Sequence, residues 1–217
     1  MALLRNIEAV IYDLDGTIID TEQLHEDGWI YACELQRVTP TRAMLEAQRG
    51  LPGDKAARMM LPPEKQNLVE EVRTTKREYV INHVGDVPIL GNFVEAYHLL
   101  QQRNLPIGVC TSQDHAFIAK VMEKQPWLSS LRERMVWKGM YTDGKPSAEP
   151  LLVTLKIMGN LAPEKVVYIG DAHADYLCAQ NAGTGFVYFC RDFQQRIKDI
   201  PVTVPTISDH QQLLELI

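Results

Sequence analysis

AVIYDLDGT, residues 9–17, joins an apolar run typical of a buried β-strand to two carboxylates and a glycine. Asp13 and Asp15 follow residues 9–12 at positions i and i+2. Alternation along an extended chain places both carboxylates on the same side, and Gly16 allows a sharp turn after them. Two neighbouring acids repel each other unless a cation or a shared proton lies between them. For this motif alone, a pair of solvated acids in a turn is the alternative interpretation.

Further runs resemble the first, because each is short, apolar and rich in Val, Ile, Tyr or Phe. The predicted strands span residues 9–12, 106–111, 135–138, 166–169 and 186–189. Apolar residues at helical spacing occupy residues 92–103, 112–123 and 150–158. Repeated alternation of strand and helix predicts an α/β fold, with a doubly wound parallel sheet covered by helices on both faces.

Residues 20–86 break this alternation, since they show helical patterns and no convincing strand. The predicted helices span residues 22–35, 42–49, 54–60 and 64–83, and stretches with Pro or Gly separate them. Compact domains rarely contain an unstructured loop of this length. We therefore predict an all-helical domain of residues 20–86, inserted into an α/β core domain of residues 1–19 and 87–217.

The composition excludes several classes of protein. The chain has 217 residues, of which 46% are hydrophobic, and a net charge of −6, which argues against general nucleic-acid binding. No apolar run approaches the ~18 residues of a membrane span, and acids near the N-terminus argue against a signal peptide. The four cysteines form no CxxC pair. We therefore expect neither a zinc site nor a disulfide framework, and a cytoplasmic location.

Hydroxyl and ammonium groups follow two later predicted strands. Thr111 ends the strand at residues 106–111 and Ser112 follows it, where a hydroxyl and backbone N–H groups are suited to hold a phosphate oxygen. A plain helix cap is the alternative for these two residues. Lys145 precedes Pro146, which favours an extended backbone and allows the ammonium to project into a cleft. Taken alone, most lysines are solvated.

Asp171 and Asp175 follow the predicted strand at residues 166–169. Their spacing of four residues corresponds to about one helical turn, so we expect them to share a helix face. A group of carboxylates favours a hard cation with oxygen ligands, which indicates Mg²⁺ rather than zinc. The alternative is a pair of acids that stabilises the positive end of a helix.

The order of these motifs is more specific than any one of them. Asp-x-Asp-Gly-Thr, Thr-Ser, Lys-Pro and Gly-Asp-x-x-x-Asp follow one another at predicted strand ends. This order resembles the four-motif signature of the haloacid dehalogenase-like hydrolase superfamily, over nearly the whole chain. The resemblance implies a helical cap inserted after the first strand, where residues 20–86 lie.

The resemblance also implies the roles of the core residues. Asp13 would be the nucleophile that forms an aspartyl-phosphate, and Asp15 would act as general acid and then as general base. Thr111 would hold a phosphoryl oxygen. Lys145 would neutralise charge on the nucleophile and on the phosphate.

A Mg²⁺ cofactor is implied in the same way. Asp13, the backbone carbonyl of Asp15 and Asp171 would bind the ion, and Asp175 would support the metal-bound waters or Lys145. Haloacid dehalogenases need no acid for the leaving group and lack one at the position of Asp15. The presence of this acid favours phosphoryl transfer over dehalogenation.

The predicted substrate-binding residues lie in both domains. They are Gly16, Thr17 and Ser112 in the core, and His25 and Arg49 in the helical insertion. The region of His25 resembles the start of the cap in the β-phosphoglucomutase and phosphoglycolate phosphatase branch, and Arg49 falls at its specificity loop. Hinge packing is the alternative role for His25. The mutase pattern has a Ser-Arg pair where this chain has Pro-Gly at residues 52–53, which argues against mutase activity.

The expected function is a magnesium-dependent phosphatase for a small phosphorylated metabolite, such as a sugar phosphate or a phosphoglycolate-like acid. One alternative is a phosphomutase, which would need a binding site for a second phosphate in the cap. Another is a non-catalytic binding protein of this fold, which predicts loss of a charged core residue, and none is lost. We expect no nucleic acid and no membrane as partner, and a monomer or weak homodimer.

Overall fold

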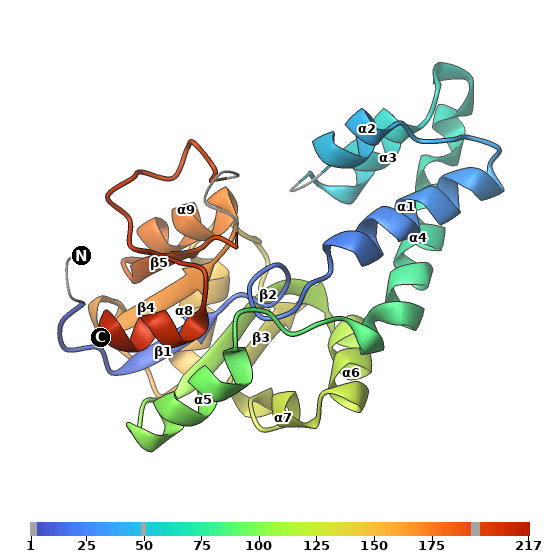
Figure 1. The fold of residues 1–217 in the computed structure, drawn as a ribbon. Helices are drawn as coiled ribbons and strands as arrows, with labels where there is room; N and C mark the ends of the chain where they lie inside the picture. The colour runs from blue at the N-terminus through green and yellow to red at the C-terminus, as the bar shows by residue number, and fades with distance from the viewer. Residues whose placement is uncertain (1–3, 49–50, 192–195) are drawn as a thin grey trace. The chain divides into compact units, whose positions relative to one another are not determined.

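The computed structural model describes residues 4–48, 51–191 and 196–217. The chain divides into two compact units, one formed by Met1–Asp20 with Pro88–Ile217 and the other by Thr21–Val87. The first unit contains a β-sheet with helices, and the second contains helices (Figure 1). The second unit therefore interrupts the sequence of the first between β1 (Ala9–Tyr12) and α5 (Phe93–Gln102).

One sheet of six strands lies at the centre of the first unit, in the order β3-β2-β1-β4-β5-β6. Each neighbouring pair is parallel. The strands are β1 (Ala9–Tyr12), β2 (Ile107–Asp114), β3 (Met135–Lys138), β4 (Val166–Gly170), β5 (Gly185–Phe189) and β6 (Thr206–Ile207). The order runs outward from β1 in both directions, as in a doubly wound α/β sheet, and confirms the predicted fold class.

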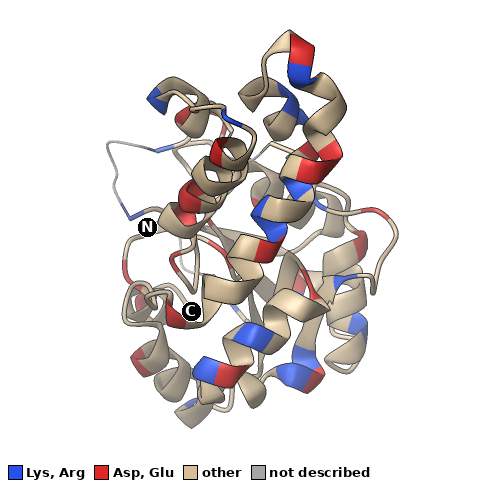
Figure 2. Cartoon of the chain, turned by 90° about the vertical axis from the view of Figure 1, so that its right-hand side faces the viewer, with Lys and Arg blue, Asp and Glu red and all other residues tan. Residues whose placement is uncertain are grey.

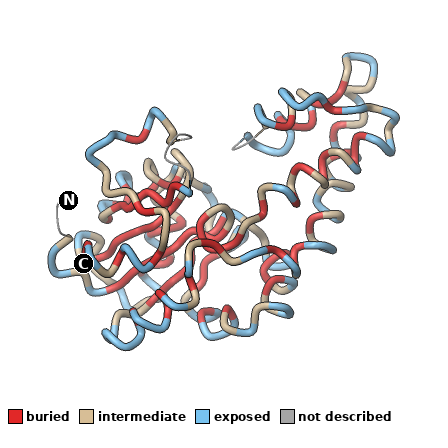
Figure 3. Tube along the Cα trace, in the orientation of Figure 1, coloured by how far each residue is buried: buried red, intermediate tan, exposed pale blue. Residues whose placement is uncertain are grey.

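Helical segments cover both faces of this sheet, and side chains of β1 point alternately to the two faces. Ile11 packs in a buried cluster with Leu151 of α8 and Ala179 of α9, whereas Tyr12 meets the edge of Phe93 in α5. Burial on both faces explains why the strands are almost wholly apolar (Figure 3). The segments are α5 (Phe93–Gln102), α6 (His115–Lys124), α7 (Pro126–Ser129), α8 (Glu149–Ile157), α9 (His173–Ala182), and the 3₁₀ turns η3 (Arg132–Arg134), η4 (Pro163–Lys165) and η6 (His210–Glu215).

Two elements of the first unit differ from the sequence prediction. The second strand continues to Asp114, so the predicted helix start at Ser112 is wrong. The Asp114 carboxylate accepts the amide N–H groups of Ala116 (3.0 Å) and Phe117 (3.2 Å), and this cap begins α6 at His115. The edge strand β6 was not predicted, because two residues are too short to show a period.

The second unit is a helical bundle with its own core. Its elements are α1 (Glu22–Leu35), α2 (Arg42–Ala47), α3 (Gly53–Met60), η1 (Pro63–Leu68), α4 (Val69–His83) and η2 (Val84–Asp86). Helices α1 and α4 pack closely at Gly28, where an added Cβ would lie 3.2 Å from Val80 Cγ2. The predicted helix of residues 64–83 is divided, since its first turn has 3₁₀ geometry.

Charged residues of both signs are interspersed along the helices, as Figure 2 shows. None of the helices in the described ranges is long and apolar enough to cross a membrane. All four cysteines lie in the described ranges and are buried, and none of them forms a disulfide there. A separate group of charged side chains lies at the carboxyl ends of the central strands β1 and β4.

Candidate active site

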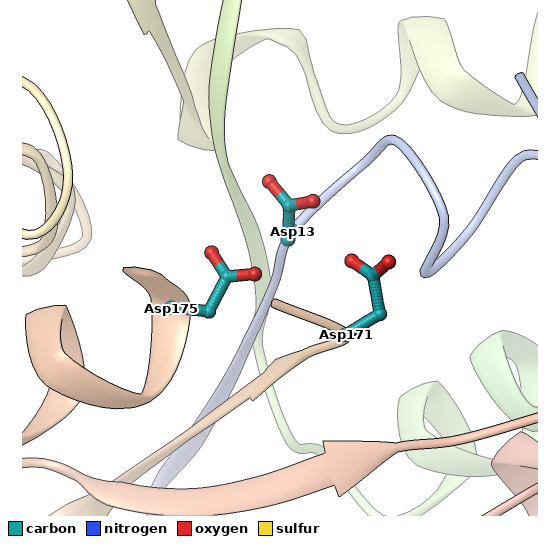
Figure 4. A group of neighbouring side chains, drawn as sticks. All are labelled: Asp13, Asp171 and Asp175. Carbon is teal, nitrogen blue, oxygen red and sulfur yellow. The ribbon is translucent and has the colours of Figure 1, made fainter. Parts of the chain in front are cut away.

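Three carboxylates meet where β1 and β4 end. Asp13 follows β1 directly, and its amide donates to the carbonyl of Ile169 in β4 (2.8 Å), so Asp13 and Asp171 lie side by side. Asp175 comes from the first turn of α9. Oxygen atoms of these three acids all lie within 4.8 Å of one another (Figure 4). The parallel sheet thus brings together acids that are 162 residues apart in the sequence (175 minus 13).

Lys145 contacts two of these three acids, and only 5% of its side chain is exposed. Its Nζ donates to Asp13 Oδ1 (2.5 Å), to Asp175 Oδ1 (2.7 Å) and to the hydroxyl of Tyr168 (2.7 Å). Burial lowers the pKa of Lys145, but the two carboxylates raise it by more, so the group stays a cation. One buried ammonium therefore connects three of the four sequence motifs.

This single cation does not balance the acids. Burial raises the pKa of Asp13 well above its usual value; Lys145 lowers it, whereas Asp175, Asp171 and Asp15 raise it. Burial, followed by the charge of Asp175, raises the pKa of Asp171 to about 7. The acids are thus held closer together than their charges favour, which is the electrostatic condition of a cation site.

Gly16 and Thr17 shape the space beside Asp171. Gly16 has φ of +74°, and a Cβ there would lie 2.2 Å from Asp171 Oδ2, so no larger residue fits without displacing that carboxylate. The hydroxyl of Thr17 donates to Asp171 Oδ1 (3.2 Å). Both residues therefore position an acid of the cluster, and their predicted contact with substrate stays a prediction.

The hydroxyl residues of β2 differ in burial. Thr111 is fully buried, and its Oγ1 accepts the amide N–H of Gln113 (3.1 Å), which leaves the hydroxyl proton for another acceptor. Ser112 is exposed. Asp15 is half-buried directly after the β1 end, and its backbone forms a bridge to Ile19. These positions do not test the predicted roles of Thr111, Ser112 and Asp15, which stay predictions.

Asp175 reaches the cluster by a different route from the one predicted. Asp171 precedes α9, which begins at His173, so the two acids do not share a helix face. Asp175 instead folds back, accepts the amide N–H of Ala172 (3.1 Å) and holds Lys145. Gly170 makes room for this, since a Cβ there would lie 2.5 Å from Asp175 Cβ.

Two residues near the cluster were not predicted. Tyr168 looked like an ordinary core residue of an apolar strand, yet its hydroxyl contacts Lys145. His210, in η6, lies fully buried against Phe189, and its Nε2 donates to the carbonyl of Thr17 (2.9 Å). No local pattern marks His210, because its partner is 193 residues away in the sequence.

We expect His210 to make stability depend on pH. Burial lowers its pKa from 6.5 to about 4, so the unfolded chain binds a proton more readily than the folded one between these values. The stability that the neutral His210 side chain gives the folded state is fully present above pH 6.5 and is lost as the pH falls toward 4. From pH 7.5 to 5.0 the free energy of unfolding should fall by about 2 kcal/mol more than in His210→Gln, which keeps an N–H donor.

Urea unfolding of both proteins at the two pH values measures this difference. The carboxylates that titrate over the same range are common to both proteins, so their contribution cancels. Equal pH dependence in the two proteins would show that His210 is not held neutral in the folded state.

The predicted substrate residues of the helical unit are only partly described. His25 lies in α1, and its Nδ1 contacts the ammonium of Lys76 at 2.6 Å, within the same unit. That ammonium also lies 5.3 Å from the ring centre of Trp29. Arg49 lies outside the described residues. Residues 52 and 53 cap and begin α3.

The fold and the cluster define an α/β protein whose acids and lysine gather at the carboxyl ends of parallel strands, as in the haloacid dehalogenase-like hydrolases. The chain belongs to this family, whose sequence model matches residues 10–189. This finding confirms the resemblance drawn from the four motifs.

Individual relatives agree with this assignment. Phosphoglycolate phosphatase of Escherichia coli K12 is 25% identical over 206 residues, covering 84% of this chain and 81% of that protein. The structure of CbbY from Rhodobacter sphaeroides in complex with phosphate has a TM-score of 0.77 at 16% identity, covering 95% and 96% of the two chains. β-Phosphoglucomutase from Clostridium difficile has a TM-score of 0.71 at 19% identity, covering 95% and 93%. The two structures establish the shared fold.

Proposed function

We propose that this protein is a magnesium-dependent phosphatase that hydrolyses a small phosphorylated metabolite through an aspartyl-phosphate on Asp13. The observation that carries the proposal is the contact of Lys145 with Asp13, beside Asp171 and Asp175, at the edge where parallel strands end. A carboxylate nucleophile, a buried cation and further acids are groups suited to phosphoryl transfer through a covalent aspartyl-phosphate.

The residues present fit a Mg²⁺ ion. The available donors are oxygen atoms. Burial, and after it the charges of neighbouring acids, raises the pKa values of Asp13 and Asp171. Asp13, Asp171 and the backbone carbonyl of Asp15 would hold the ion, while Asp175 stays with Lys145. A bound Mg²⁺ supplies positive charge that draws a phosphate dianion toward these acids.

In the first step, a carboxylate oxygen of Asp13 attacks phosphorus and forms a new P–O bond. The bond from phosphorus to the ester oxygen breaks, and this oxygen keeps the electron pair and takes a proton from Asp15. Lys145 balances the negative charge that gathers around Asp13 and the phosphoryl oxygens. The products are the free alcohol and an aspartyl-phosphate.

In the second step, Asp15, now a carboxylate, takes a proton from a water molecule. The water oxygen attacks phosphorus, and the bond between phosphorus and Asp13 breaks, with the electron pair returning to Asp13. Inorganic phosphate leaves, and the starting state of both acids is restored. Thr111 would donate its hydroxyl proton to a phosphoryl oxygen in both steps.

The relatives and the second unit support the proposed substrate class. A relative at 25% identity is named phosphoglycolate phosphatase, which supports a phosphoglycolate-like acid or a sugar phosphate. Residues 20–86 would form a cap on a core of residues 1–19 and 87–217. His25 and Arg49 of that cap would contact the part of the substrate that leaves.

A panel of phosphorylated metabolites tests this function by release of inorganic phosphate. We expect release from at least one small phosphate ester, its loss in excess EDTA and its recovery when excess Mg²⁺ is added. Isomerisation of a sugar phosphate that depends on a bisphosphate, without net phosphate release, would indicate a phosphomutase. Absence of Mg²⁺-dependent release from every ester would contradict the proposal.

A further inference from the structure

The hydroxyl of Tyr168 is the group of this site that the proposed mechanism does not use. Tyr168 lies in β4, between apolar neighbours, and is fully buried. Its ring packs near Phe186, with 6.2 Å between ring centres, on the face of the sheet covered by α8 and α9. A phenylalanine would supply the same apolar contact, so the hydroxyl needs a separate explanation.

The hydrogen bonds of this hydroxyl follow from counting protons. The ammonium of Lys145 has three N–H groups and three acceptors: Asp13 Oδ1, Asp175 Oδ1 and Tyr168 Oη. Since an ammonium only donates, Tyr168 accepts from it. The single proton of Tyr168 then goes to Asp175 Oδ1 (2.8 Å) rather than to the more distant carbonyl of Cys110 (3.3 Å).

The surroundings keep Tyr168 a neutral phenol. Burial raises its pKa well above the usual value, and the charges of Asp175 and Asp13 raise it further. A neutral phenol accepts one hydrogen bond and donates another, as this position requires. The lysine is thereby held on three sides and has no N–H group without an acceptor.

We infer that Tyr168 is a positioning residue: it takes the third N–H of Lys145 and so holds the ammonium against Asp13. The inference rests on the proposed function, because it assigns Tyr168 a part in orienting the nucleophile. Without the hydroxyl, one N–H of a buried ammonium loses its acceptor, and the ammonium tilts away from its present position.

Tyr168→Phe tests the inference, and Tyr12→Phe is its matched control. Tyr12 is also fully buried, in the neighbouring strand β1, and its hydroxyl has no hydrogen-bond partner among the described residues. We expect Tyr168→Phe to lower kcat about tenfold with KM within about twofold of the unchanged protein. Tyr12→Phe should leave both constants unchanged. A kcat of Tyr168→Phe within twofold of the unchanged protein would overturn the inference.

A second measurement is independent of activity. The ammonium protons of Lys145, observed by ¹H–¹⁵N correlation and assigned with Lys145→Met, should exchange slowly with water in the unchanged protein and in Tyr12→Phe. They should exchange faster in Tyr168→Phe. If they exchange equally slowly in that variant, the inference is wrong. If no phosphate ester is hydrolysed but exchange behaves as expected, the proposed function fails while the hydrogen-bond role of Tyr168 stands.

Discussion

Asp13→Asn should lower kcat for phosphate-ester hydrolysis by a factor on the order of 10⁴ or more. An amide oxygen is a far weaker nucleophile than a carboxylate, so the first P–O bond no longer forms. The fold should persist, because Asn has nearly the same shape and its oxygen still accepts from Lys145. Steady-state kinetics on the substrate found in the metabolite panel measures the loss.

The matched control for this substitution is Asp54→Asn, which makes the same chemical change at an exposed position in α3. That variant should keep full activity. The melting temperatures of both variants, measured without substrate, show whether the fold is retained. Near-normal turnover by a folded Asp13→Asn protein would remove Asp13 from the role of nucleophile and the proposed mechanism with it.

Lys145→Met should reduce both activity and stability. The substitution removes the cation that contacts two buried carboxylates, Asp13 and Asp175. Breaking a buried ion pair by removing one partner destabilises a protein by roughly 3–5 kcal/mol, and we expect a loss of this size at pH 7.5. Activity should fall by about 10²–10³-fold or more, since charge on the phosphoryl oxygens is no longer balanced.

The loss of stability in Lys145→Met should also depend on pH in a definite direction. Lys145 lowers the pKa of Asp13, which burial already holds above 3.8, so its removal raises that pKa further. A carboxyl group with a raised pKa destabilises the folded state increasingly as the pH rises above its unfolded value. The difference in unfolding free energy between the unchanged protein and Lys145→Met should therefore be larger at pH 7.5 than at pH 5.0.

Urea unfolding at both pH values measures this difference, with Lys156→Met as the control. Lys156 is exposed on α8, so its replacement should change stability by less than about 0.5 kcal/mol at either pH. A Lys145→Met protein as stable as the control at pH 7.5 would show that the two acids do not depend on the ammonium.

Much of the fold was predictable because its signals are local. The strands at Ala9–Tyr12 and Met135–Lys138 and the helix at Glu22–Leu35 have the predicted bounds, since runs of apolar residues and their spacing define them directly. The start of α6 was not predictable in the same way. Its cap competes with an extended strand, and the pairing of β2 with β3 continues the strand to Asp114.

The same distinction between local signals and tertiary contacts applies to the residues of the site. Asp13, Lys145, Asp171 and Asp175 were found as motifs, and the resemblance implied that Lys145 lies near Asp13 and Asp175. How the backbone brings Asp175 there was not predicted. Asp175 was expected to share a helix face with Asp171 and instead folds back onto Lys145. Tyr168 gave no signal, because a tyrosine in a buried strand has the same pattern whether or not its hydroxyl has a partner.

By itself, the sequence determined the alternation of strands and helices and the order of the charged motifs, because periodicity and strand-end chemistry are properties of short segments. Only the tertiary structure decided which groups touch: that one ammonium joins Asp13, Asp175 and Tyr168, and that His210 reaches the carbonyl of Thr17. Such contacts join residues far apart in the chain, and they depend on the order of strands in the sheet and on packing that no local pattern encodes.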